Sequence, residues 1–329
     1  MSITAAPKLS AVSPCYNEME SLAELYRRLT AACAAEVGDD YEIVLIDDGS
    51  SDATRSMITE LCNRDPHVVG VLLSRNHGHQ LALSAGLHIC RGERILIIDA
   101  DLQDPPELIG PMMKLMDGGA DVVYGQRRAR QGESIFKQFS AFAFYRLLNT
   151  MIDIKIPIDV GDFRLMSRRT VDELNRMPER YRFIRGMVSW IGFRQVPLQY
   201  DRHERFAGDT KYPLGKMLRF AVDAISGFST LPLRMATYLG FLCSIMGMFF
   251  FAYTVYSYFT GIAIQGWTTL MTVVLILGSG QLLVLGVMGE YLGRLYIQSK
   301  NRPLFIIEDV IRAPATTSSH DMPLNAIRD

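Results

Sequence analysis

The chain has 329 residues, a formal net charge of −1 and 49% hydrophobic residues. The near-neutral charge argues against a general nucleic-acid-binding protein, which would carry a strongly basic surface. Residues 235–289 contain no Asp, Glu, Lys, Arg or His, and this length accommodates two membrane-spanning helices of about 20 residues each.

The five cysteines are scattered along the chain, with no paired spacing typical of a metal site. We interpret them as reduced and structural, which favours a cytosolic globular part. The first residues lack the long apolar core of a signal peptide.

The first half of the chain alternates short apolar runs with helical patterns. Strands are predicted at residues 9–13, 41–46, 68–73, 95–99 and 121–124. The intervening segments place apolar residues on one helical face, as in Leu22, Leu25, Tyr26 and Leu29. This alternation predicts an α/β fold with a doubly wound, mostly parallel, Rossmann-like sheet.

Small and polar residues follow each predicted strand. Residues 14–18 come after the first strand, residues 47–52 after the second and residues 76–78 after the third. Ligands of open α/β sheets collect at the carboxyl ends of the strands, so these loops are candidates for a nucleotide site. His77 and His79 are interpreted as loop residues because no third metal ligand lies nearby in sequence.

Asp99 and Asp101 follow the fourth strand and are two residues apart. If the extended backbone continues this far, both carboxylates point to one side. Mg²⁺ or Mn²⁺ would take one or two such carboxylates and complete its shell with phosphate oxygens and water. The alternative is a solvated acidic loop, which is what a lone Asp-x-Asp pair usually forms.

Four motifs in this order resemble family-2 glycosyltransferases of the GT-A fold, and among them the polyprenyl-phosphate glycosyltransferases of the bactoprenol glucosyltransferase and dolichol-phosphate mannosyltransferase type. They are Pro14-Cys15-Tyr16-Asn17-Glu18, Asp47-Asp48-Gly49-Ser50-Ser51-Asp52, Asn76-His77-Gly78 and Asp99-Ala100-Asp101-Leu102-Gln103-Asp104-Pro105-Pro106-Glu107. The resemblance extends over nearly the whole chain.

The resemblance implies roles for individual residues. The nucleotide sugar would contact Pro14, Tyr16, Asn17, Glu18, Asp48 and Asp99. The metal, Mg²⁺ or Mn²⁺, would bind Asp99 and Asp101, with Gln103 close to the sugar. Asp101 and Gln103 are therefore candidate catalytic residues, together with Asp162 and, as a weaker candidate, Asp159.

The middle of the chain is expected to recognise the acceptor. Residues 134–151 are apolar and aromatic with interspersed cations, which predicts a helix lying at the membrane interface; a buried core helix is the alternative. Residues 202–213 resemble the family's Arg-x-x-Gly-x-Ser-Lys-Tyr loop, with Thr210 where Ser is usual. Arg205 and Lys211 of this loop, with Arg127, are candidates for binding a lipid phosphate. The alternative is a charged, solvated loop.

We divide the chain into a cytosolic domain at 1–232, a transmembrane hairpin at 233–297 and a C-terminal segment at 298–329. The domain includes a second interfacial helix at 214–228. The hairpin has spans at 233–259 and at 267–288, the latter extending to about residue 297. Cations flank the hairpin on both sides, so the positive-inside rule places both ends in the cytoplasm. The resemblance implies that the membrane is a bacterial inner membrane.

The last segment contains a predicted strand at 303–308, followed by a tail that is expected to be disordered after residue 313. This strand could return to a sheet, either that of the same chain or that of a neighbouring subunit, and we expect a homo-oligomer.

The expected activity is that of a membrane-bound inverting glycosyltransferase. It would move one sugar, glucose from UDP-glucose, to polyprenyl (undecaprenyl) phosphate on the cytoplasmic face, for cell-envelope glycosylation. One alternative is a processive polysaccharide synthase, although the Gln-x-x-Arg-Trp motif of those enzymes is absent here. The other is a non-enzymatic membrane scaffold that only binds a nucleotide or a partner.

Overall fold

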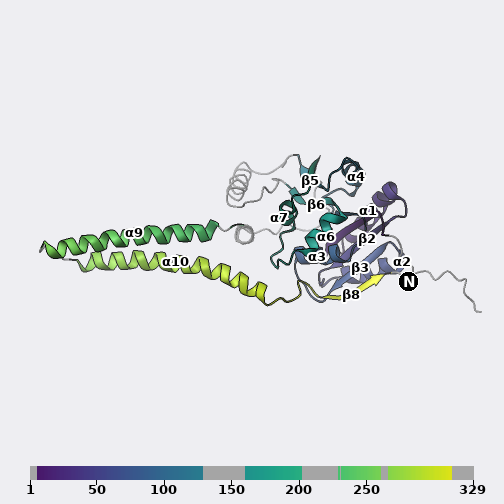
Figure 1. Ribbon diagram of the computed structural model, residues 1–329. Coiled ribbons are helices and arrows are strands. Elements are labelled where there is room, and N and C mark those ends of the chain that lie inside the picture. Colours follow the sequence, from purple (N-terminus) through teal and green to yellow (C-terminus); the bar gives the residue numbers. More distant parts are fainter. Residues whose placement is uncertain (1–5, 129–159, 202–228, 230, 261–265, 313–329) are drawn as a thin grey trace, which may run out of the picture.

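The computed structural model describes residues 6–128, 160–201, 229, 231–260 and 266–312. These residues form one sheet with helices on both faces and a helical hairpin that projects away from it (Figure 1). The helices predicted at 134–151 and 214–228 lie outside the described residues.

The sheet has eight strands in the order β7-β5-β6-β4-β1-β2-β3-β8. Among these strands, only β6 and β8 run opposite to the others, which confirms the mostly parallel, Rossmann-like arrangement. The strands are β1 (Leu9–Cys15), β2 (Tyr41–Asp47), β3 (Val68–Leu73), β4 (Arg94–Ile97), β5 (Val122–Arg127), β6 (Val160–Ser167), β7 (Gln195–Tyr200) and β8 (Ile307–Arg312).

The central strands are buried on both faces. Every residue of β1, β2 and β3 is buried, because both sides of the sheet are covered by helices. Continuous apolar runs are typical of such strands, since neither face meets water. This is why the runs near the start of the chain could be identified as strands from sequence.

Two sets of helices cover the two faces of the sheet. One core contains buried residues of α1 (Leu22–Val37), α2 (Thr54–Arg64) and α4 (Ile109–Asp117), which follows a short 3-10 helix at Pro106–Leu108. The other core contains those of α3 (His79–Ile89), α6 (Arg168–Arg176) and α7 (Ile184–Ile191). In α1 the predicted apolar face is confirmed, with Leu22, Leu25 and Leu29 fully buried.

The helix α3 lies unusually close to the sheet at Gly86. A Cβ atom at this position would lie 2.5 Å from side-chain atoms of both Ile46 and Val12. Real Cβ atoms do not approach so closely, so only glycine permits this packing. The close approach packs the second half of α3 against β1 and β2.

Two strands in the second half were not predicted. β6 lies in the middle of the sheet, between β4 and β5, and β7 forms one edge. The sequence of β6, VGDFRLMS, carries Asp162 and Arg164 within a buried strand. Charged residues in a central strand hide the apolar pattern on which the sequence argument depended.

The strand predicted at 303–308 begins later than expected, and it returns to the sheet of the same chain. β8 begins at Ile307, and it pairs antiparallel with β3 of the same chain. The strand is therefore not shared with a neighbouring subunit, and a homo-oligomer stays a prediction.

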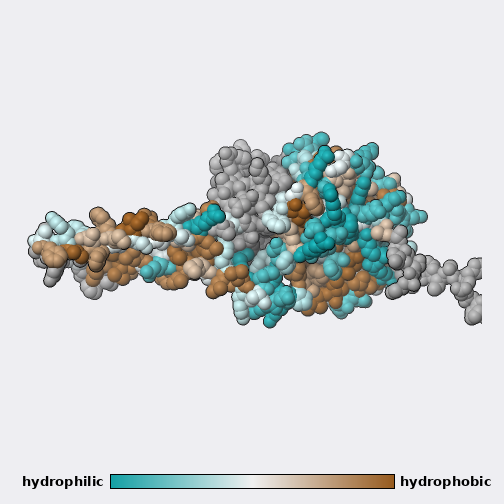
Figure 2. All heavy atoms as spheres, viewed as in Figure 1, coloured by the Kyte–Doolittle hydropathy of each residue, from teal (hydrophilic) through white to brown (hydrophobic). Residues whose placement is uncertain are grey.

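The hairpin consists of α9 (Leu231–Phe259) and α10 (Trp267–Ser299). Both helices are long and apolar enough to cross a membrane. Their large apolar side chains are exposed, for example Phe249 at 69% and Leu282 at 71%, and Figure 2 shows hydrophobic residues along the length of the hairpin. Such a continuous exposed apolar surface is typical of a membrane-inserted segment.

Candidate active site

The loops that follow β1 and β2 are joined by hydrogen bonds. The Asn17 side-chain oxygen accepts the Ser51 N–H at 2.8 Å, and the Asn17 N–H donates to the Ser50 hydroxyl at 3.1 Å. The Glu18 N–H donates to the Thr54 hydroxyl at 2.8 Å. Asn17 has a φ of 55°, a conformation that Asn adopts more readily than most residues. The first two sequence motifs therefore form one continuous surface.

Asp48 connects the second motif to the third. Its buried carboxylate accepts the His77 N–H at 2.7 Å and the Gly78 N–H at 3.0 Å. Burial raises the pKa of Asp48, and these two hydrogen bonds partly oppose that rise. Gly49 has a φ of +68° and lies against the backbone of Arg75, where a Cβ would be 2.6 Å from a carbonyl carbon. No other residue would fit there without moving the loop.

The predicted nucleotide-binding residues lie around these joined loops. Pro14 is buried within β1, whereas Tyr16 is 48% exposed and Asn17 is also exposed. Glu18 is partly buried and accepts a hydrogen bond from the Ser21 hydroxyl at 2.7 Å. Tyr16 is therefore available to stack on a planar group, whereas the carboxylate of Asp48 is turned to the backbone of the third motif.

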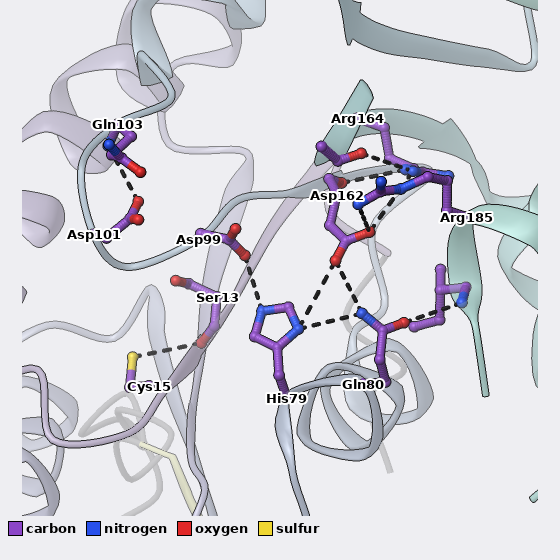
Figure 3. A network of polar contacts seen from close by, with 12 residues as sticks. Ser13, Cys15, His79, Gln80, Asp99, Asp101, Gln103, Asp162, Arg164 and Arg185 are labelled. Atoms are coloured by element: carbon purple, nitrogen blue, oxygen red, sulfur yellow. Dashed lines mark hydrogen bonds and ion pairs between the residues drawn. The ribbon is translucent and has the colours of Figure 1, made fainter. Parts of the chain in front are cut away.

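The two carboxylates after β4 do not extend from one strand face, so the assumption of a continuing extended backbone is wrong. β4 ends at Ile97, residues 100 and 101 form a turn, and Leu102 has a φ of 59°. Asp101 accepts the Gln103 N–H at 3.2 Å. Figure 3 shows the Asp99 side chain directed toward His79 and the Asp101 side chain directed away from it.

His79, at the start of α3, lies between two carboxylates. Its Nε2 atom is 2.9 Å from Asp99 Oδ1, and its Nδ1 atom is 3.9 Å from Asp162 Oδ2 (Figure 3). Burial lowers the pKa of His79, but the hydrogen bond with Asp99 and the charges of Asp99, Asp162 and Asp48 outweigh burial and raise it to about 9. His79 thus joins the acidic motif after β4 to the acidic residue of β6.

Asp162 is held by cations and an amide. Arg185 donates to Asp162 Oδ1 at 3.4 Å, Arg164 forms an ion pair with the same oxygen at 3.9 Å, and Gln80 donates to Oδ2 at 2.9 Å. Burial alone would raise the pKa of Asp162, but Arg185, Arg164 and His79 hold it well below its usual range. A carboxylate so firmly ionised is a weak base, and its rigid partners suit it to orient another group.

Arg127, at the end of β5, contacts Tyr200 and lies beside Gly161 of β6. The hydroxyl of Tyr200 is a hydrogen-bond partner of Arg127, and that hydroxyl donates to the Asp104 carboxylate. A Cβ atom built on Gly161 would lie 3.2 Å from the Arg127 guanidinium, so Arg127 lies directly beside the backbone that carries Asp162. The Arg127 guanidinium therefore lies next to Gly161, one residue before Asp162 in the chain.

The structure brings most of the predicted residues to one edge of the sheet. Three of them, Asp159, Arg205 and Lys211, lie outside the described residues.

The sequence argument missed four residues of the site, His79, Gln80, Arg164 and Arg185. Arg164 could have been found, because residues two apart in a strand share a face and Asp162 was already a candidate. Arg185 reaches the site only through the packing of α7, and no local pattern marks it.

Comparison with known proteins gives the family of the chain. The profile of glycosyl transferase family 2 matches residues 10–174, and the profile of the GtrB C-terminal hairpin matches residues 231–295. A protein of Escherichia coli, the prophage bactoprenol glucosyl transferase homolog, is 41% identical over 92% of this chain and 99% of its own length. The bactoprenol glucosyl transferase of Shigella phage SfV is 39% identical over 92% of this chain and 98% of its own length.

Solved structures with a similar fold are more distant in sequence. The mannosyltransferase PcManGT from Pyrobaculum calidifontis, in complex with GDP-Man and Mn²⁺, has 17% identity and a TM-score of 0.44, and the match covers 86% of this chain and 88% of that one. The two relatives match this chain over the sheet, the loops of the site and the hairpin alike. Together with the family match, they establish that this chain belongs to glycosyl transferase family 2 and is a glycosyltransferase.

Proposed function

We propose that the protein transfers a single glucose from UDP-glucose to a polyprenyl phosphate at the cytoplasmic face of the membrane. The observation that carries this proposal is the sequence identity of 41% and 39% to the two bactoprenol glucosyl transferase relatives. The match extends over the hairpin as well as the sheet. A lipid acceptor also suits a chain that combines a nucleotide-type sheet edge with two exposed apolar helices.

The nucleotide sugar would bind across the joined loops after β1, β2 and β3, next to the loop after β4. Tyr16, Asn17 and Glu18 would contact the base and ribose, and Asp48 would act through the loop of His77 and Gly78 that it holds. This placement keeps the reactive end of the donor over Asp99, at the carboxyl end of β4.

The two carboxylates after β4 suit a metal ion that also binds the phosphates of the substrate. Asp99 and Asp101 are both partly exposed, and the described part of the chain contains no cluster of three His, Cys, Asp or Glu side chains that would enclose a metal. Mg²⁺ or Mn²⁺ needs only one or two carboxylates when phosphate oxygens and water complete its shell. Bound there, the ion would neutralise the diphosphate and stabilise the leaving nucleotide.

The acceptor would require positioning more than deprotonation. A phosphate monoester has a second pKa of about 6 and is therefore largely a dianion at neutral pH. Arg127 would hold this phosphate, together with Arg205 and Lys211 of the loop outside the described residues. Asp162, ionised and fixed by Arg164 and Arg185, would orient the acceptor for in-line attack on the anomeric carbon. One direct displacement inverts the configuration and gives a β-linked product.

Charges flanking the hairpin give its proposed orientation. Arg234 lies near its start, Lys300 and Arg302 follow its end, and residues 260–266 between the helices carry no charge. By the positive-inside rule, both termini and the sheet would lie on the cytoplasmic side of the membrane, which we propose is a bacterial inner membrane. The donor and the lipid phosphate would then meet on the side where nucleotide sugars are made.

The test is sugar transfer by the purified full-length protein in detergent. Radiolabelled UDP-glucose, UDP-galactose, UDP-N-acetylglucosamine and GDP-mannose would each be offered with polyprenyl phosphate and Mg²⁺ or Mn²⁺. Label from UDP-glucose in a single lipid product is the expected result. Labelled lipid formed from another nucleotide sugar would show that a different sugar is transferred. Label in insoluble polymer would favour a processive synthase. Nucleotide binding without transfer from any of the four would favour a scaffold.

A further inference from the structure

The C-terminal end of α10 is attached to the loop between α6 and α7. The Gln298 side chain accepts the Arg180 N–H at 3.1 Å and donates to the Pro178 carbonyl at 2.8 Å. One amide therefore satisfies both a donor and an acceptor of the loop backbone, which otherwise would have to find other partners. Figure 1 shows α7 on the side of the sheet domain that faces the hairpin.

Two more contacts fix the same loop. The Arg180 guanidinium donates to the Arg302 carbonyl at 2.6 Å, just beyond α10. The Arg294 guanidinium lies 4.5 Å from the centre of the Tyr181 ring and pairs with Glu290 at 2.9 Å on the same helix. Cation–π contact and hydrogen bonds together hold the loop against the last two turns of α10.

The other end of this loop leads into the site. Ile184, the first residue of α7, donates its N–H to Gln80 Oε1 at 3.0 Å, and Gln80 Nε2 donates to Asp162 at 2.9 Å (Figure 3). The next residue, Arg185, donates to the other oxygen of Asp162 at 3.4 Å. The start of α7 therefore contacts both carboxylate oxygens, once directly and once through Gln80.

We propose that Gln298 is a positioning residue, through which the end of the transmembrane helix α10 sets the position of α7 and hence of the Asp162 carboxylate. This inference rests on the proposed function. The phosphate of a lipid acceptor is confined to the height of the membrane surface, whereas the donor is bound to the sheet. A carboxylate that orients the acceptor must therefore be aligned with both, and small errors in such alignment lower the rate steeply.

The first test compares Gln298→Ala with Ser299→Ala in the full-length protein. Ser299 is a matched control, because it is next on the same helix and its hydroxyl donates to the Tyr296 carbonyl within α10. We expect Gln298→Ala to lower kcat for lipid glycosylation about tenfold, with the KM for the nucleotide sugar changed less than about twofold. Gln298→Glu, which still accepts the Arg180 N–H, should fall between Gln298→Ala and the wild type. Wild-type kcat in Gln298→Ala would overturn the inference, as would a loss confined to the KM for the donor.

The second test is a double-mutant cycle with Gln80→Ala. If both glutamines act through the position of α7, Gln298→Ala should have little further effect on kcat in the Gln80→Ala background, whereas independent effects would multiply. Multiplying effects would overturn the inference.

A third measurement does not depend on activity. Amide hydrogen exchange should become faster over residues 178–185 in Gln298→Ala and remain unchanged in Ser299→Ala. Unchanged exchange in both variants would overturn the link between α10 and α7. Failure of the proposed function would appear differently, as a wild-type protein that glycosylates no polyprenyl phosphate.

Discussion

At the scale of single residues, the site depends on side chains that each serve two partners. His79 lies between Asp99 and Asp162, Asp48 accepts two backbone N–H groups, and Gln80 both donates and accepts. Such shared contacts make the position of each group depend on its neighbours, because no partner can move without breaking a second contact.

Asp99→Ala and Asp101→Ala should each abolish metal-dependent transfer, with a loss of at least about 100-fold, because the cation that they would hold stabilises the leaving nucleotide. The fold should persist, since both side chains are partly exposed. Transfer assays with Mg²⁺, Mn²⁺ and excess chelator measure the loss, and circular dichroism is the control. Activity that persists in chelator in either variant would contradict the metal assignment.

Arg205→Ala tests the proposed acceptor contact. A hydrogen bond to a charged group is worth roughly 1.5–3 kcal/mol, so we expect the KM for the lipid phosphate to rise about tenfold or more. The KM for UDP-glucose should rise much less. Kinetics with each substrate varied in turn provide the comparison, and an equal or reversed effect would remove Arg205 from the acceptor site.

Asp121 provides a pH-dependent contribution to stability away from the site. The guanidinium of Arg169 contacts both its carboxylate oxygens at 2.5 Å and holds the pKa of Asp121 below its usual range. A carboxyl with a depressed folded-state pKa stabilises the fold above its unfolded-state pKa of about 4, and this contribution is lost as the pH falls through the folded-state pKa.

Asp121→Asn should therefore lower the thermal midpoint of unfolding at pH 7, and its difference from the wild type should shrink below about pH 4. Scanning calorimetry in detergent from pH 7 to pH 3 measures this. The control is Glu173→Gln on α6, whose partner Arg176 has a 73% exposed side chain, and it should shift the midpoint little at any pH. A difference between Asp121→Asn and the wild type that stays constant with pH would contradict the assignment.

At the scale of elements, burial decided which strands could be predicted. β1, β2 and β3 are apolar and buried throughout, so their positions were predicted within two residues. β6 is equally central, but Arg164 within it is only 2% exposed and is paired with Asp162. A buried ion pair needs a partner from the tertiary structure, and the sequence pattern alone assigns such residues to the surface.

Gly86→Ala tests the close packing of α3. The new Cβ would overlap Ile46 and Val12, so we expect destabilisation of about 1–3 kcal/mol, as for other overpacked cores. Chemical unfolding in detergent measures this change. Gly278→Ala is the control, since no atom lies within 4 Å of its Cβ position in α10. Wild-type stability for Gly86→Ala would show that the helix can move away from the sheet.

At the scale of the whole molecule, the chain returns from the hairpin to complete its own sheet. β8 covers the edge of β3, and Glu308 pairs with Arg55 at 2.7 Å, while Arg55 also pairs with the buried Asp47 at 3.1 Å. The Ile306 N–H lies 3.4 Å from His77 Nε2, next to the loop that Asp48 holds. The segment after the hairpin therefore contacts the loops that we propose to bind the nucleotide.

A chain ending at residue 302 should lose thermal stability and bind UDP-glucose more weakly. The edge of β3 would be uncovered, and the contacts of Glu308 with Arg55 and of Ile306 with His77 would be lost. A chain ending at residue 312 keeps β8 and should match the full-length protein. Thermal unfolding and calorimetric titration with the nucleotide sugar provide the measurements. Equal behaviour of the two chains would show that β8 adds nothing to the site.

The sequence by itself determined the fold class, the family and the loops that we propose to bind the donor. Apolar runs and the motifs after them are local patterns, and a local pattern can be read without knowing what packs beside it. The uncharged stretch from 235 to 289 similarly indicated the apolar hairpin.

Only the tertiary structure decided which side chains meet. Three sets of contacts join residues far apart in the chain. His79 lies near Asp162, and Asp162 is held by Arg164, Arg185 and Gln80. The end of α10 is attached to the loop before α7. These contacts arise from the order of the strands and the packing of α3 and α7, and neither leaves a periodic signal in the sequence.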